Sequence, residues 1–142
     1  MSIAPEFRAA LVRGLKAGSR GIAIATDDEV RAIALLEDVG RDLGWPVHTW
    51  SSAAGLDGSG APRAFAELLA TLRSRKDEPG IVVVLDALAA IVPRGVGEAA
   101  ALRTLRELCQ RNSGPAVVLV DPDGVHAAAD LGARIPEIVV EA

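Results

Sequence analysis

Four aspartates that follow apolar stretches are the residues best suited to chemistry in this chain. Asp27 and Asp28 come after the first such stretch, Asp86 after a later one and Asp121 after the next. Carboxylate oxygens are the ligands that Mg²⁺ prefers, and three of them in one place can hold the ion. One interpretation of Asp27, Asp28 and Asp86 is therefore a magnesium site. In the phosphoacceptor form of this hypothesis, Asp86 is also the nucleophile.

The same acids also have a structural explanation. Asp27, Asp28 and Glu29 fall in the first turn of a predicted helix, where carboxylates interact favourably with free amides and with the helix dipole. Thr26, with Glu29 three residues later, is typical of a capping box. Asp121 begins an ordinary turn sequence. Both interpretations stay open at this point, and Asp86 is the acid that a structural role explains least well.

A phosphate-binding loop is not found after the first apolar stretch. Such a loop needs the pattern G-x-x-x-x-G-K-[ST], whose amides and lysine meet the phosphate charge. Asp27 and Asp28 stand where the phosphates would lie, and like charges at contact distance repel. We therefore expect no ATP binding of the usual kind, no cofactor-binding residue and no catalytic residue in this chain.

Composition limits the classes of partner. The chain has 142 residues, a formal net charge of −4, 50% hydrophobic residues and 3% aromatic residues. An acidic chain is a poor match for nucleic acid or an anionic membrane. No apolar run approaches the ~20 residues that span a bilayer. The single cysteine, Cys109, lies among apolar helix positions, so we expect a small core residue rather than a nucleophile. Because a single cysteine cannot form an internal disulfide, we also expect a cytoplasmic protein.

Apolar periodicity predicts one domain over residues 1–142 in which helices and strands alternate. Four-residue spacing of apolar side chains indicates helices, and short continuous aliphatic runs indicate buried strands. The predicted helices are 5–17, 27–43, 62–75 and 97–111, and the predicted strands are 21–26, 47–50, 81–86, 116–120 and 137–140. This alternation favours an α/β fold of three layers, with a five-stranded, mainly parallel sheet between helices.

Ligands of parallel sheets gather beyond the carboxyl ends of the strands. The acids described above fall at that edge, and so do the residues that follow the second strand. We therefore predict an interaction surface there, formed by Trp50, Ser51, Asp86 and Asp121.

Read in order, the segments of the chain resemble a known family. The stretch "GIAIATDDEVRAIALLEDVGRDLGWPVHTWSSAAGL" is similar to the start of the cyanobacterial and plastid-type AAA+ ATPases known from a conserved chloroplast open reading frame. The matching positions are Thr26, Asp28, Glu29, Arg31, Val47, Trp50, Ser51, Gly55 and Leu56. Later, "IVVVLDAL", "LRTLRELCQ" and "VVLVDPDGVHAAADLGARIPEIVVEA" also fit, although Asp121-Pro122 replaces the usual Ser-Pro.

The resemblance implies a degenerate RecA-like domain with strand order 5-1-4-3-2, a Walker-B-like acid at Asp86 and no phosphate loop. It implies a regulatory or protein-interaction domain whose partner is an AAA+ ATPase module or its oligomer. The richness in Ala, Gly and Arg indicates a bacterial source. Any ATPase activity would belong to that separate module. Both an excised N-terminal domain and a free-standing relative fit the sequence.

Two alternatives stay open beside this interpretation. The first is a receiver or pseudo-receiver domain that binds Mg²⁺ at its acidic edge, for which the strand order would be 2-1-3-4-5. The second is a small-ligand domain that uses the glycine-rich loop 55–60. Strand order distinguishes the first alternative from a RecA-like fold.

Overall fold

Short aliphatic stretches and amphipathic stretches alternate along the chain, and they form the strands and helices of one mixed sheet and its covering layers. The computed structural model describes residues 5–75, 77–87, 96–111, 113–122 and 137–139. The helices are α1 (Pro5–Lys16), α2 (Glu29–Leu43), α3 (Phe65–Ser74) and α5 (Val96–Cys109). The strands are β1 (Gly21–Ala25), β2 (Val47–Ser51), β3 (Gly55–Leu56), β4 (Gly80–Leu85), β5 (Pro115–Asp121) and β6 (Glu137–Val139).

The strands form one sheet in the order β3-β2-β4-β5-β1-β6. All neighbouring strands are parallel except β2 and β3, which pair antiparallel. Without the two-residue β3, which was not predicted, this is the expected RecA-like order 5-1-4-3-2. The receiver alternative is wrong, because a receiver places its first strand between the second and third, whereas here β1 lies between β5 and β6.

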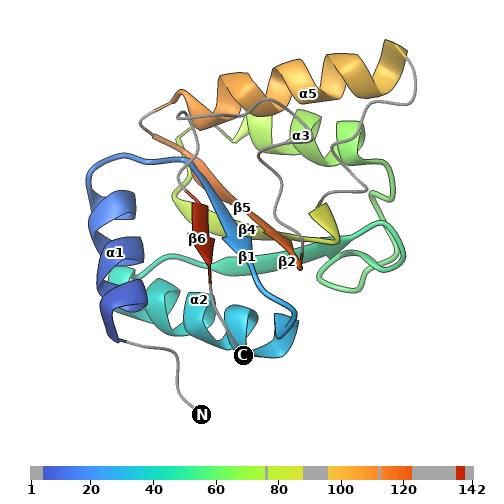
Figure 1. The fold of residues 1–142 in the computed structure, drawn as a ribbon. Coiled ribbons are helices and arrows are strands. Elements are labelled where there is room, and N and C mark those ends of the chain that lie inside the picture. The colour runs from blue at the N-terminus through green and yellow to red at the C-terminus, as the bar shows by residue number, and fades with distance from the viewer. Residues whose placement is uncertain (1–4, 76, 88–95, 112, 123–136, 140–142) are drawn as a thin grey trace.

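Two hydrophobic cores lie on opposite faces of the sheet. Successive residues of a strand point to opposite faces, so Val82 and Val84 pack toward α3 and α5, while Ile81 and Val83 pack toward α1 and α2. Figure 1 shows the two helix pairs on either side of the sheet. This arrangement explains why β4 and β5 are continuous aliphatic runs: both of their faces are buried.

Helix α2 connects the carboxyl ends of the strands with the opposite edge. It ends as the sequence predicts, because Gly44 adopts a left-handed conformation with φ of 72° and donates to the carbonyl of Arg41. Its buried face contains Leu36 and Val39, but Val30, which the periodicity places on that face, is 77% exposed. Val30 lies in the first turn of α2, one residue after the helix begins.

Among the described residues, no helix is both long and apolar enough to span a membrane.

Candidate functional site

The carboxyl ends of β1, β2, β4 and β5 form one edge of the sheet because these strands are parallel. The acids and polar residues predicted as functional follow these strands. The structure therefore brings the predicted residues to the same edge, and the question is which of their side chains are accessible and close together.

The turn between β1 and α2 is closed by its own side chains. The hydroxyl of Thr26, which is 4% exposed, accepts a hydrogen bond from the backbone N–H of Asp28 at 3.1 Å. The carboxylate of Asp28 accepts one from the N–H of Arg31, also at 3.1 Å. Asp28 is therefore the N-cap residue of α2.

The predicted capping box is thus wrong in its register. Helix α2 begins at Glu29 rather than at residue 27, and Thr26 is not its N-cap. The reason is that Thr26 still belongs to the sheet side of the turn, where its N–H donates to the carbonyl of Asp121 at 3.2 Å. The structural explanation holds for Asp28, whereas Asp27 is exposed beside it.

Asp86 follows β4 with an unusual backbone. Its φ of 50° lies in the left-handed region, which aspartate tolerates better than most residues with a side chain. The residue is exposed at the edge of the sheet. Aspartate at this position therefore turns the chain sharply out of the strand and presents a carboxylate to solvent.

The three carboxylates of the predicted magnesium site are not gathered. In the part of the chain that the structure describes, no three His, Cys, Asp or Glu side chains lie close enough together to hold a metal ion. Asp27, Asp28 and Asp86 are all within that part. Magnesium binding stays a prediction that this geometry does not support.

The predicted interaction surface needs correction, because two of its four residues are buried. Trp50 is 1% exposed and Asp121 is 7% exposed. The indole N–H of Trp50 donates to the carbonyl of Pro62 at 2.7 Å, and its ring lies 5.7 Å from that of Phe65 between centroids. Trp50 anchors the segment before α3, so its aromatic bulk serves packing. Asp86 and the partly buried Ser51 are the members of this set that solvent reaches.

Pro62 was predicted inside the third helix, but α3 begins only at Phe65. The carbonyl of Pro62 instead accepts the indole N–H of Trp50.

The turn into β3 begins at Ser51, whose hydroxyl accepts the N–H of Ala54 at 3.1 Å. The glycine-rich loop 55–60 is thereby folded back on β2 as a short hairpin.

This hairpin is held by hydrogen bonds within its own backbone, which argues against its use as a ligand loop. The N–H of Leu56 donates to the carbonyl of Ala61 at 3.2 Å, and the N–H of Gly60 donates to Ala54 at 2.8 Å. A Cβ at Gly55 would lie 2.4 Å from the nitrogen of Ala61, so only glycine fits there. The glycines of this loop thus permit a tight turn against its own backbone.

The pairing of His48 with Asp57 was not predicted from the sequence. The imidazole Nδ1 of His48 lies 2.6 Å from a carboxylate oxygen of Asp57. The other oxygen accepts the N–H of Thr49 at 2.9 Å, and the N–H of Asp57 donates to the carbonyl of Thr49 at 2.7 Å. No periodic pattern in the sequence indicated this pair, because the two residues meet only through the β2–β3 hairpin.

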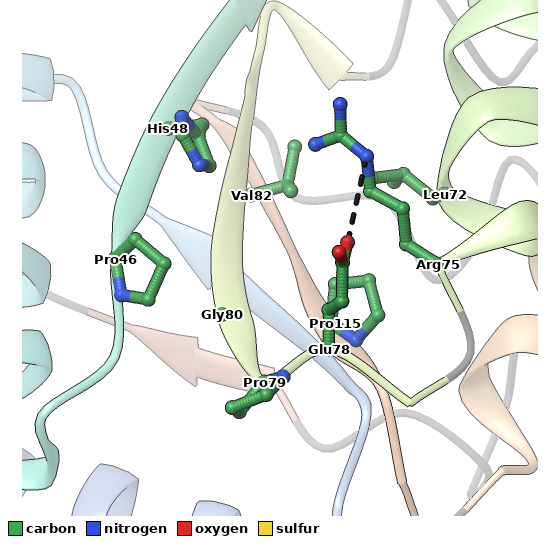
Figure 2. Close-up of a pocket in the computed structure, with 9 residues that line it drawn as sticks. All are labelled: Pro46, His48, Leu72, Arg75, Glu78, Pro79, Gly80, Val82 and Pro115. Carbon is green, nitrogen blue, oxygen red and sulfur yellow. Dashed lines mark ion pairs between the residues drawn. The ribbon is translucent and has the colours of Figure 1, made fainter.

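A pocket of about 240 Å³ lies at the amino edge of the sheet, where β2, β4 and β5 begin. Its apolar lining includes Pro46, Pro79 and Pro115. His48 and Arg75 also line it, and Figure 2 shows them on either side of Val82. This pocket faces away from the acidic edge and was not predicted.

Comparison with known proteins identifies the family. No curated protein matches the chain. The family model described as the N-terminal domain of SpoVK-like AAA ATPases matches residues 7–139, which is nearly the whole chain and includes both sheet edges. The chain therefore belongs to the family of SpoVK-like AAA ATPase N-terminal domains.

Proposed function

We propose that this domain is a non-catalytic regulatory or protein-interaction domain of an AAA+ ATPase, and that its phosphate-binding loop has been lost. The observation that carries the proposal is the closed turn between β1 and α2. In a phosphate loop the backbone N–H groups at this helix end point at the ligand. Here the hydroxyl of Thr26 and the carboxylate of Asp28 accept such N–H groups instead.

Charge supports the same proposal. A phosphate at this helix end would approach the carboxylates of Asp27 and Asp28. At about 4 Å, each pair of unit like charges costs about 1 kcal/mol in water and several times more where water is excluded. The turn between β1 and α2 also has no glycine and no lysine that could bind the phosphate.

Calorimetric titration with ATP–Mg²⁺ tests this loss. We expect no saturable heat with the wild-type domain. The Asp27→Asn/Asp28→Asn variant should behave alike, because removing the charge does not supply the missing loop. Saturable binding by wild type at micromolar ATP would overturn the proposal.

The partner in this proposal is an AAA+ ATPase module or its oligomer. The carboxyl edge is the favoured contact surface, because Asp86 and Asp27 are exposed there and Val30, three residues after Asp27, is an exposed apolar side chain. An exposed acid next to an apolar group suits a partner surface with a basic residue near an apolar contact.

Binding and ATPase measurements with an AAA+ module of the same family test this partner. We expect the domain to bind the module and to change its ATP hydrolysis rate, and Asp86→Arg to weaken both effects. Glu37→Arg is the matched control, because it makes the same charge change on the exposed side of α2. The proposal fails if wild type does not bind, or if the two variants behave alike.

The finer relation to the cyanobacterial and plastid-type AAA+ ATPases, a bacterial origin and a cytoplasmic location belong to the same proposal. The resemblance of the "HTWSSAAGL" stretch supports the first, and the single cysteine is compatible with a reducing compartment. Fractionation of cells that produce the protein would test the location directly.

A further inference from the structure

The geometry points to a second site in this domain: the pocket at the amino edge of the sheet binds a small organic carboxylate with an apolar body. The ligand's carboxylate would pair with Arg75, and its apolar body would lie against the prolines of the pocket. This inference goes beyond the proposed interaction with an ATPase, because the pocket lies at the edge of the sheet opposite to Asp86.

Arg75 is placed to bind an anion. It is the C-cap residue of α3, and its backbone N–H donates to the carbonyl of Leu72 at 3.1 Å, which fixes where its side chain begins. Its guanidinium Nε lies 3.8 Å from a carboxylate oxygen of Glu78, which is longer than a hydrogen bond. Among the described residues, Arg75 has no side-chain hydrogen bond, so its donors are available to a ligand carboxylate in two-point geometry.

Glu78 occupies the ligand's place only loosely. Its side chain is 70% exposed, and exposed ion pairs contribute little. Figure 2 shows the Glu78 carboxylate pointing toward the Arg75 guanidinium, on the side of Val82 away from His48. A ligand carboxylate can therefore replace Glu78, which then turns into solvent without leaving a buried charge behind.

His48 supplies a polar contact on the opposite wall. Its Nδ1 lies against the carboxylate of Asp57, an acceptor, so this nitrogen carries the hydrogen in the neutral ring. Nε2 is then the acceptor that remains for a ligand. A hydroxyl group on the ligand, at the far end from its carboxylate, would donate to this nitrogen.

The walls between these groups are apolar and rigid. Pro46, Pro79 and Pro115 lack backbone donors and lose little side-chain freedom when they are covered. Leu72 and Val82 form the floor toward the core. With a volume of about 240 Å³, the pocket suits a flat or branched body of the size of one ring.

An NMR titration with benzoate, 4-hydroxybenzoate and benzamide tests the inference. We expect benzoate to shift the amide signals of Arg75, Gly80 and Val82 saturably, with a Kd on the order of 1 mM. The hydroxyl of 4-hydroxybenzoate should tighten binding several-fold through His48. Uncharged benzamide should bind at least about tenfold more weakly, because it cannot pair with the guanidinium.

Two pairs of variants separate this site from general charge effects. Arg75→Gln should abolish saturable benzoate shifts, whereas Arg73→Gln on the same helix should leave them unchanged. Glu78→Gln should tighten benzoate binding because it removes the competing carboxylate, whereas Asp77→Asn, with the same charge change next to it, should not. An unchanged spectrum elsewhere shows that each variant is folded.

The inference is overturned if benzoate produces no saturable shift at the pocket, or if benzamide binds as well as benzoate. It is also overturned if Arg75→Gln matches Arg73→Gln, or if Glu78→Gln weakens binding. Because no ATPase module is present in this titration, the result does not depend on the proposed partner.

Discussion

At the scale of single residues, Asp28 has the clearest structural task. Its carboxylate accepts the N–H of Arg31 and so satisfies a backbone donor that the start of any helix leaves open. We expect Asp28→Ala to lower the free energy of unfolding by about 1 kcal/mol, the usual effect of removing an N-cap side chain. Urea denaturation followed by circular dichroism measures this change.

Asp27→Ala is the control for this prediction. Asp27 is the exposed neighbour of Asp28 and carries the same charge, but it is not the N-cap. We expect it to change stability by less than about 0.5 kcal/mol. Equal losses for the two variants would mean that net charge, and not the capping hydrogen bond, governs stability at this helix end.

The sequence predicts that Cys109 has a packing role, and the reactivity of its thiol tests this prediction. The thiol lies partly buried against the core under α3 and α5, and burial raises its pKa to about 12. Very little thiolate is then present at neutral pH. We expect the native protein to react with a disulfide reagent such as DTNB at least about tenfold more slowly than the urea-unfolded chain. Equal rates in the two states would contradict this.

At the scale of elements, Arg8 joins α1 to α2. Its Nε donates to the carboxylate of Asp38 at 2.8 Å, and its guanidinium also pairs with Asp42. The hydrogen bond from Arg8 holds the pKa of Asp38 below its ordinary value. A carboxyl group with a lowered pKa stabilises the fold at neutral pH, and this contribution is lost as the pH falls through the pKa of the folded state.

Asp38→Asn should therefore be less stable than wild type at pH 7 and nearly as stable in strong acid. The difference at pH 7 is expected to be small, because the pair is exposed. Urea midpoints measured from pH 7 down to about pH 2 give the comparison. Glu37→Gln, one residue away, is the control. The difference between its urea midpoint and that of wild type should not become smaller as the pH falls. A gap between wild type and Asp38→Asn that stays constant over this range would contradict the prediction.

The elements were predictable where one physical signal dominates. Continuous aliphatic runs identify β4 and β5 because both faces of these strands are buried, and Gly44 ends α2 because the left-handed C-cap favours glycine. The hairpin of β3 has only two residues and no period, so it left no such signal. Without that hairpin, the contact between His48 and Asp57 could not be foreseen.

The candidate site was predictable only in its position. The alternation of strands and helices placed Asp86 and Asp121 at the same edge, but it gave no information on how deeply each of them is buried. Asp121 is buried because the next parallel strand, β1, continues alongside it to Ala25, whereas Asp86 leaves β4 through a left-handed turn. The pocket depends on the first residues of three separate strands, which no local pattern brings together.

At the scale of the whole molecule, the two edges of the sheet differ in kind. The carboxyl edge is closed at β1 by Thr26 and Asp28 and presents exposed acid at Asp86. The amino edge is open between the starts of β2, β4 and β5, where Arg75 has no side-chain hydrogen bond among the described residues. In our proposals, the carboxyl edge is a protein contact without ATP chemistry and the amino edge is a ligand pocket, so the two functions lie at separate places.

Both cores meet at β4 and β5, and this determines how the molecule should open. The alternate residues of these strands fill the core under α3 and α5 and the core under α1 and α2. Their amides should exchange with solvent only through global unfolding, which for a domain of this size lies at about 5–15 kcal/mol. The β3 hairpin is held mainly by local hydrogen bonds and should open separately, several kcal/mol below that level. Native-state hydrogen exchange at increasing denaturant measures both. Slow exchange at Leu56 and Gly60 equal to that at Val83 and Val118 would mean instead that the hairpin is part of the cooperative core.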